Sequence, residues 1–155
     1  MLITGAKGAG KSTLLRAIIE GTAPTGVQSS VERGADGLPA RIWLGAWDGA
    51  RECVIGTRGA DGMRPHRDAF DATGVELVRA ARLSPGEWAA VDEIGFLEEC
   101  SPRYIDELRQ LFDCKRVLAA VRKADTPFIC ELRARADCCV LDLDELEEGQ
   151  WTQDV

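Results

Sequence analysis

The chain has 155 residues, 45% of them hydrophobic and 29% charged, which is ordinary for one globular domain with a single hydrophobic core. Apolar runs are all shorter than the ~18 residues of a membrane span, and the net charge of -7 disfavours a nucleic-acid binder, because a phosphate backbone requires a basic surface. No signal peptide precedes the first motif, so we expect a cytoplasmic protein that neither enters a membrane nor binds nucleic acid.

A phosphate-binding motif joins the first two predicted elements. Leu2–Thr4 predicts a short buried strand, and Lys11–Glu20 predicts a helix with one apolar face. The residues between them match G-x-x-x-x-G-K-[ST], the P-loop, in which backbone N–H groups cradle phosphates. Lys11 would neutralise the β- and γ-phosphates, and Ser12 would ligate Mg²⁺. We therefore predict that ATP, GTP or another nucleoside triphosphate binds with Mg²⁺ at Gly5, Ala6, Lys7, Gly8, Ala9, Gly10, Lys11, Ser12 and Thr13.

The next segment predicts a strand, a hairpin and a loop. Val27–Val31 has the composition of a second strand. Arg41–Trp47 and Glu52–Gly56 alternate on either side of Asp48-Gly49, a dipeptide typical of a hairpin turn. The glycine-rich segment Gly56–Arg64 is expected to be a loop.

Two adjacent acids end the next strand. Arg67–Arg82 has helical spacing, and the apolar run Trp88–Val91 then leads directly into Asp92 and Glu93. A buried parallel strand delivers carboxylates in this way at its C-terminal end. Asp92 would hold Mg²⁺, and Glu93 would orient and deprotonate an attacking water.

The rest of the chain continues the alternation of helices and strands. Ser101-Pro102 and Thr126-Pro127 each predict a helix start, while Arg116–Val121 and Cys138–Leu141 predict strands. The whole order indicates an α/β P-loop fold: a mainly parallel central sheet with helices on both faces and an inserted β-hairpin. We expect one domain over residues 1–155, ending in an acidic tail at 142–155 that is solvated.

Weaker signals concern basic residues that could sense the γ-phosphate or belong to a lid over the phosphates. Arg122 and Lys123 follow the strand Arg116–Val121, at the sheet edge that should face the nucleotide. Arg58 lies in the glycine-rich segment, which could close over the phosphates. Solvated surface charge is the competing interpretation for all three residues.

The string V-D-E-I-G-F-L-E, residues 91–98, resembles the D-E-I-G-x-x-E signature of the small stand-alone nucleoside-triphosphatases. That family belongs to the P-loop class with an additional central strand and a catalytic glutamate. The resemblance implies a RecA-type core and slow, Mg²⁺-dependent hydrolysis of several nucleoside triphosphates. It also implies that Asp92 is the metal-side acid, Glu93 the general base, and Glu98 a further acid of the site.

The predicted activity is therefore hydrolysis of nucleoside triphosphates to diphosphate and phosphate, with Glu93 and Lys11 as catalytic residues and with broad base specificity. Two alternatives stay open. One is a nucleotide or small-molecule kinase, in which Asp92 or Glu93 would activate an acceptor hydroxyl. The other is an accessory ATPase that acts through a protein partner.

Overall fold

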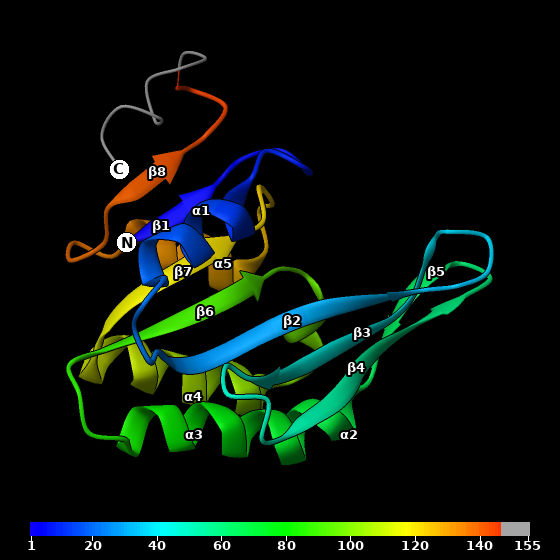
Figure 1. Ribbon diagram of the computed structural model, residues 1–155, viewed down its shortest axis with the longest axis horizontal. Coiled ribbons are helices and arrows are strands. Elements are labelled where there is room, and N and C mark those ends of the chain that lie inside the picture. The colour runs from blue at the N-terminus through cyan, green and yellow to red at the C-terminus, as the bar shows by residue number, and fades with distance from the viewer. Residues whose placement is uncertain (147–155) are drawn as a thin grey trace.

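One eight-stranded sheet organises residues 1–146, the part of the chain that the computed structural model describes (Figure 1). Its strand order is β5-β4-β3-β2-β6-β7-β1-β8. In chain order, the strands are β1 (Leu2–Thr4), β2 (Thr25–Arg33), β3 (Pro39–Ala46), β4 (Glu52–Gly59), β5 (Gly62–Pro65), β6 (Trp88–Ile94), β7 (Arg116–Val121) and β8 (Val140–Asp142).

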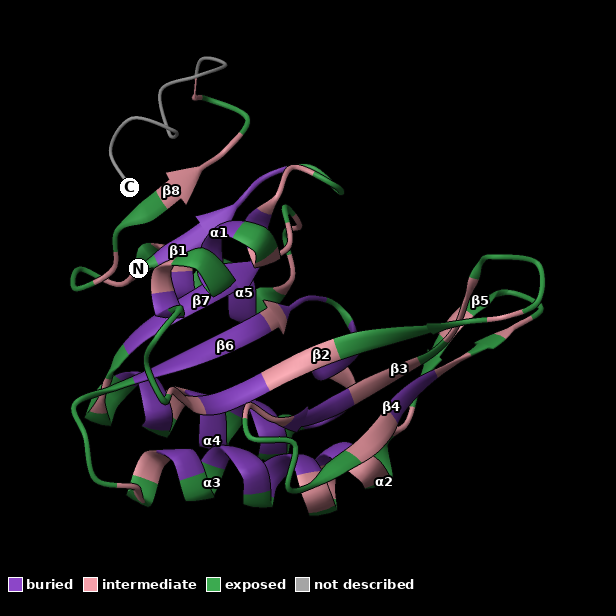
Figure 2. Cartoon of the chain, viewed as in Figure 1, coloured by how far each residue is buried: buried purple, intermediate pink, exposed green. Residues whose placement is uncertain are grey.

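Helices cover both faces of this sheet, as the sequence predicts. They are α1 (Lys11–Ile19), α2 (Arg67–Ala69), α3 (Val75–Leu83), α4 (Pro102–Cys114) and α5 (Pro127–Ala134). Leu14, Leu15 and Ile19 of α1 pack against one face of the central strands, whereas the apolar residues of α3, α4 and α5 pack on the opposite face. Buried residues are therefore concentrated in the central strands and the inward sides of the helices (Figure 2). Within residues 1–146, every helix is too short or too polar to traverse a lipid bilayer.

The parallel half of the sheet carries the predicted sites. β8, β1, β7, β6 and β2 run parallel, so their C-terminal ends reach the same edge. β7 lies between β1, which leads into the P-loop, and β6, which carries Asp92 and Glu93. This is the additional central strand that the family resemblance implies, and the α/β P-loop fold is confirmed.

The antiparallel half is larger than the single hairpin we predicted. β2, β3, β4 and β5 form a continuous meander, whose far end projects from the body as a twisted ribbon (Figure 1). The hairpin around Asp48-Gly49 is confirmed as β3 and β4. The expected loop over Gly56–Arg64 is wrong, because its residues pair as the end of β4 and as β5, with a tight turn at Ala60-Asp61.

The helix predicted over Arg67–Arg82 forms, but with an irregular middle. Phe70–Gly74 is wound as a π-helix between α2 and α3. The fully buried ring of Phe70 lies 4.8 Å from that of Tyr104 on α4. The π-helical turn thus lies where this segment packs against α4. The hydrophobic spacing of the sequence does not predict this change from α- to π-helix.

Candidate functional site

The P-loop runs from the end of β1 to the start of α1. Gly8 and Gly10 have φ angles of +84° and +94°, in the left-handed region that glycine adopts without strain. The ammonium group of Lys11 is buried under the loop and donates hydrogen bonds to the carbonyl oxygens of Gly5 and Ala6, at 3.1 and 3.0 Å. Residues of the loop line a cavity of about 490 Å³, which Lys11, Ser12 and Thr13 share with Glu93 and Arg122. The predicted phosphate-binding and catalytic groups therefore meet in one cavity.

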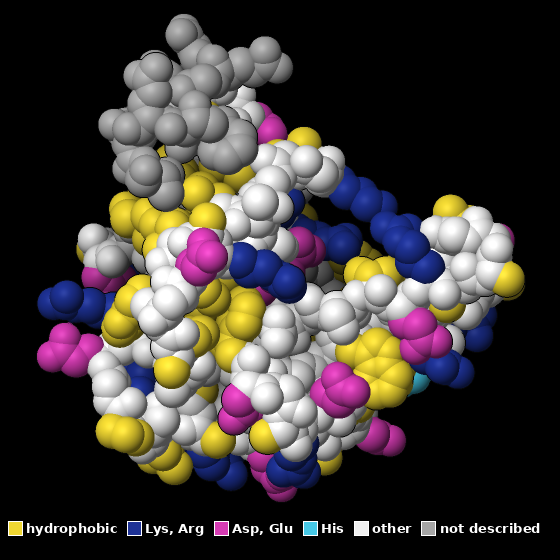
Figure 3. Space-filling view, viewed as in Figure 1, with side chains coloured by type: hydrophobic (Ala, Val, Ile, Leu, Met, Phe, Trp, Pro, Cys, Tyr) yellow, Lys and Arg dark blue, Asp and Glu magenta, His cyan; other side chains and the backbone are white. Residues whose placement is uncertain are grey.

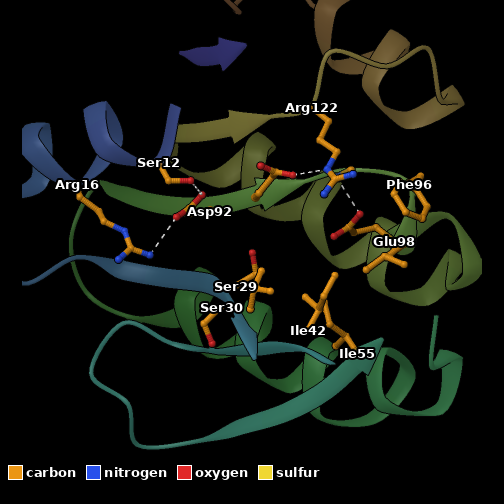
Figure 4. Close-up of a pocket in the computed structure, with 14 residues that line it drawn as sticks. Ser12, Arg16, Ser29, Ser30, Ile42, Ile55, Asp92, Phe96, Glu98 and Arg122 are labelled. Atoms are coloured by element: carbon orange, nitrogen blue, oxygen red, sulfur yellow. Dashed lines mark hydrogen bonds and ion pairs between the residues drawn. The ribbon is translucent and has the colours of Figure 1, made fainter. Parts of the chain in front are cut away.

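Asp92, on β6, faces the start of α1 (Figure 4). Its Oδ1 accepts a hydrogen bond from the Ser12 hydroxyl at 2.7 Å, and its Oδ2 pairs with the Arg16 guanidinium at 3.4 Å. Burial raises the pKa of Asp92, although the Ser12 hydrogen bond and the Arg16 charge oppose the effect. Sequence reasoning missed Arg16; its position one helical turn after Ser12 was the available signal.

Glu93 is held by Arg122, which follows β7. The Arg122 Nε donates to Glu93 Oε1 at 2.5 Å, and no residue from 1 to 146 donates to Glu93 Oε2. The Arg122 guanidinium also lies over the half-exposed Phe96 ring, 5.2 Å from its centroid. Arg122 thus orients Glu93 through one carboxylate oxygen. Sequence reasoning also missed Phe96.

Glu98 lies below this pair on a short 3₁₀ turn, Leu97–Cys100, which follows β6. Only 5% of Glu98 is exposed, and its Oε2 accepts a hydrogen bond from the backbone N–H of Gly95 at 2.9 Å. Burial raises the pKa of Glu98 to about 7. The third acid of the D-E-I-G-x-x-E string therefore faces the same region as Glu93, with a proton that can exchange near neutral pH.

Lys123 lies in the wall of the phosphate cavity, but acids of the C-terminal segment hold it. Its ammonium group pairs with Asp142 at 2.8 Å and with Asp144 at 2.9 Å. Both oxygens of Asp144 also accept from the N–H of Ala6, at 3.0 Å, so this carboxylate bonds the P-loop itself. The expectation of a wholly solvated acidic tail is therefore wrong for its first residues. Residues 147–155 of that tail lie outside the described part of the chain.

Arg58 is not brought to the site. It lies on β4 in the projecting ribbon, where it pairs with Asp36 at 2.7 Å. It lines neither the phosphate cavity nor a second, adjoining cavity that Ser29 and Glu98 line. The prediction that the segment Gly56–Arg64 closes over the phosphates as a lid is therefore wrong, because its residues pair within the sheet as the end of β4 and as β5. Figure 3 shows that basic side chains gather around the hollow between the body and the ribbon.

Comparisons with known proteins agree with this arrangement. Two curated nucleoside-triphosphatases THEP1, from Thermotoga sp. (strain RQ2) and Thermotoga maritima, are each 24% identical over the whole of this chain and 92% of their own length. The crystal structure of THEP1 from Aquifex aeolicus superposes with a TM-score of 0.72 at 20% identity, covering 92% of this chain and 88% of that one. The solution structure of a human cancer-related nucleoside triphosphatase gives 0.71 at 20% identity, covering 92% and 87%. A family model described as NTPase matches residues 50–155, more than half of the sequence, and the chain therefore belongs to the NTPase family.

Proposed function

We propose that this protein hydrolyses nucleoside triphosphates to the diphosphate and phosphate at the junction of the P-loop and β6. The observation that carries the proposal is that Glu93 lines the same cavity as Lys11, while Asp92 contacts Ser12. A water-activating carboxylate and a phosphate cradle thus face each other. The names of the curated relatives, nucleoside-triphosphatases, support the same activity.

The triphosphate would be held chiefly by its phosphates. The N–H groups of the P-loop and the start of α1 provide a positive concavity for the β-phosphate. Lys11 would leave the carbonyl oxygens of Gly5 and Ala6 and turn to the β- and γ-oxygens. Because these contacts do not involve the base, we expect ATP, GTP, CTP and UTP to be turned over at similar, slow rates.

The donor set at Ser12 and Asp92 fits Mg²⁺. Magnesium prefers oxygen ligands and is usually bound by one or two protein groups together with substrate phosphates. Ser12 Oγ and Asp92 Oδ1 are such oxygens, 2.7 Å apart, and no three His, Cys, Asp or Glu side chains within residues 1–146 form a cage for a metal. Ser12 and Asp92 would hold the ion, which neutralises charge that develops on the phosphates during transfer.

Glu93 would position and deprotonate the attacking water. Its Oε2 has no donor from residues 1–146, so it can accept a hydrogen bond from a water in the cavity, while Oε1 stays bound to Arg122. Water oxygen attacks the γ-phosphorus, the bond from that phosphorus to the β–γ bridging oxygen breaks, and the proton passes to Glu93. Arg122 would serve as a positioning residue for Glu93 and place positive charge near the transferred group.

The test is Glu93→Gln with phosphate release measured for four nucleotides, with Mg²⁺ and with EDTA. Loss of the base should lower kcat about 10²- to 10⁴-fold, while the Kd for ATP stays within a few-fold. Glu99→Gln is the matched control, because Glu99 lies on the neighbouring turn, bonds the N–H of Phe128 and lines neither cavity. Full activity of Glu93→Gln, or an equal loss in both variants, contradicts the assignment.

A further inference from the structure

A second cavity, of about 340 Å³, adjoins the phosphate cavity beyond Asp92 and Glu93 (Figure 4). The two cavities share Ser12, Glu93 and Arg122, so they meet where the γ-phosphate would lie. Hydrolysis requires room for one water, which occupies about 30 Å³ in the liquid. The second cavity instead falls in the range of small-molecule sites, roughly 300–1,000 Å³. It has space for a ligand that hydrolysis does not use.

The walls of this cavity combine hydrogen-bonding groups with an apolar side. Parallel pairing of β2 with β6 ends at Gln28, so from Ser29 onward the edge of β2 that faces the cavity pairs with no strand formed by residues 1–146. Backbone groups on an unpaired edge, together with the Ser29 hydroxyl, can bind a polar ligand. Ile42 and Ile55 supply the apolar side. This composition suits a molecule that carries both hydroxyl groups and carbon surface.

The charges around the cavity favour an uncharged ligand. Arg16 already pairs with Asp92, and Arg122 pairs with Glu93. Glu98 adds a third acid to these walls, and among residues 1–146 the cations that line them are Arg16 and Arg122. An anionic ligand would therefore meet two arginines that are already paired with acids, whereas a neutral ligand needs no free cation to bind.

We propose that this cavity binds a neutral, hydroxyl-bearing small molecule and that the protein transfers the γ-phosphoryl group to it. The inference rests on the proposed function, since both reactions use the same phosphate cradle and Glu93. Water and the alcohol then compete for one phosphoryl group. Hydrolysis is what occurs when the second cavity holds only solvent.

The transfer step parallels hydrolysis atom for atom. The alcohol oxygen forms a bond to the γ-phosphorus, and the bond from that phosphorus to the β–γ bridging oxygen breaks. The nucleoside diphosphate leaves with the bonding electrons, and the hydroxyl proton passes to Glu93 and from there to solvent. The products are a phosphate monoester and the diphosphate, so no oxidant, reductant or further reactant is required.

The experiment measures diphosphate and free phosphate together, with Mg²⁺-ATP and one of three neutral alcohols: glycerol, glucose or uridine. Without alcohol, hydrolysis gives equal amounts of both products, and the absence of either product contradicts the proposed function. With an accepted alcohol, ADP should exceed phosphate by the amount of monoester seen by ³¹P NMR. Equal ADP and phosphate with all three alcohols overturns the inference while leaving hydrolysis intact.

Two variants at one position connect transfer to this cavity. Ser29→Phe fills it and should lower the ratio of monoester to phosphate by about tenfold or more, the scale on which pockets reject poorly fitting groups. Ser29→Ala keeps the space and removes a single hydrogen-bonding group, so it should lower the ratio less than Ser29→Phe does. Leu83→Phe, at the exposed end of α3, adds the same ring away from both cavities and should change neither product. An unchanged ratio in a folded Ser29→Phe protein, checked by circular dichroism, overturns the inference.

Discussion

The buried carboxyl of Glu98 should make the stability of the protein fall as the pH rises through neutrality. Glu98 is 5% exposed, and burial moves its pKa from the ordinary 4.5 to about 7. The groups that face it are the carboxylate of Glu93, the guanidinium of Arg122, the Tyr104 hydroxyl and the Cys100 thiol. Burial outweighs the attraction of the single cation, so the folded protein favours the neutral acid.

The sign and size of the effect follow from linkage between proton binding and folding. Because the folded-state pKa is the higher one, the stabilisation is complete below about pH 4.5 and is lost as the pH rises through about 7. The difference between 4.5 and about 7 corresponds to about 3 kcal/mol, at roughly 1.4 kcal/mol per pH unit. That is a large share of the ~5–15 kcal/mol by which a domain of this kind is stable.

Glu98→Gln removes the ionisation but keeps the side chain's length and an oxygen for the Gly95 N–H. Urea unfolding at intervals from pH 5 to pH 8.5 should show the free energy of unfolding of the unmodified protein falling by up to about 3 kcal/mol relative to that of Glu98→Gln. Glu99→Gln, on the same turn, controls for loss of a carboxylate. Parallel profiles for Glu98→Gln and the unmodified protein would refute the reasoning, as would a difference of opposite sign.

Three further substitutions test the site and the sheet. Lys11→Ala removes a charged phosphate contact and should raise the Kd for ATP roughly tenfold or more by calorimetry; unchanged affinity would contradict the cradle. Arg122→Ala releases Glu93 and should lower kcat roughly 10²-fold in the phosphate-release assay with little change in Kd, whereas full activity would remove its positioning role. Gly26→Ala would place a Cβ 2.0 Å from the carbonyl oxygen of Ala90 at a φ of +118°, and should cost about 4 kcal/mol or prevent folding; a normal urea midpoint would show that β2 can move away from β6.

The sequence was sufficient where a motif and its flanking elements imposed one geometry. The P-loop needs a strand before it and a helix after it, and both are present with nearly the predicted bounds. The carboxylates of β6 follow the same logic, because parallel strands end at one edge of a sheet. These two rules alone bring Lys11, Ser12, Asp92 and Glu93 together.

Asp-Gly dipeptides mark all three turns of the antiparallel meander. Asp-Gly predicted the hairpin at Asp48-Gly49, and the same dipeptide occurs at Asp36-Gly37 and Asp61-Gly62, where the chain also reverses between antiparallel strands. The arginines and polar residues beside these two turns masked the strands, because a projecting ribbon is exposed and lacks the alternation that burial imposes. The sequence therefore predicts one hairpin with a loop where the structure has the β2–β3–β4–β5 meander.

Side-chain partners at the site could not be predicted by spacing. Arg122 binds Glu93 across 29 residues of sequence, and Asp144 binds the N–H of Ala6 across 138 residues. Both contacts depend on the order of the strands in the sheet, which a single sequence does not determine. Lys123 lines the cavity beside the P-loop, but its two acidic partners come from a segment whose composition predicts a solvated end.

The contact between Asp144 and the P-loop has a consequence for biosynthesis. The glycine-rich loop leaves the ribosome more than a hundred residues before β8 and the Asp144 carboxylate that bonds Ala6. A fragment that stops before residue 140 contains the whole P-loop motif but lacks β8, one of the two strands that pair with β1. A product truncated there would carry the P-loop without the Asp144 carboxylate that bonds the N–H of Ala6.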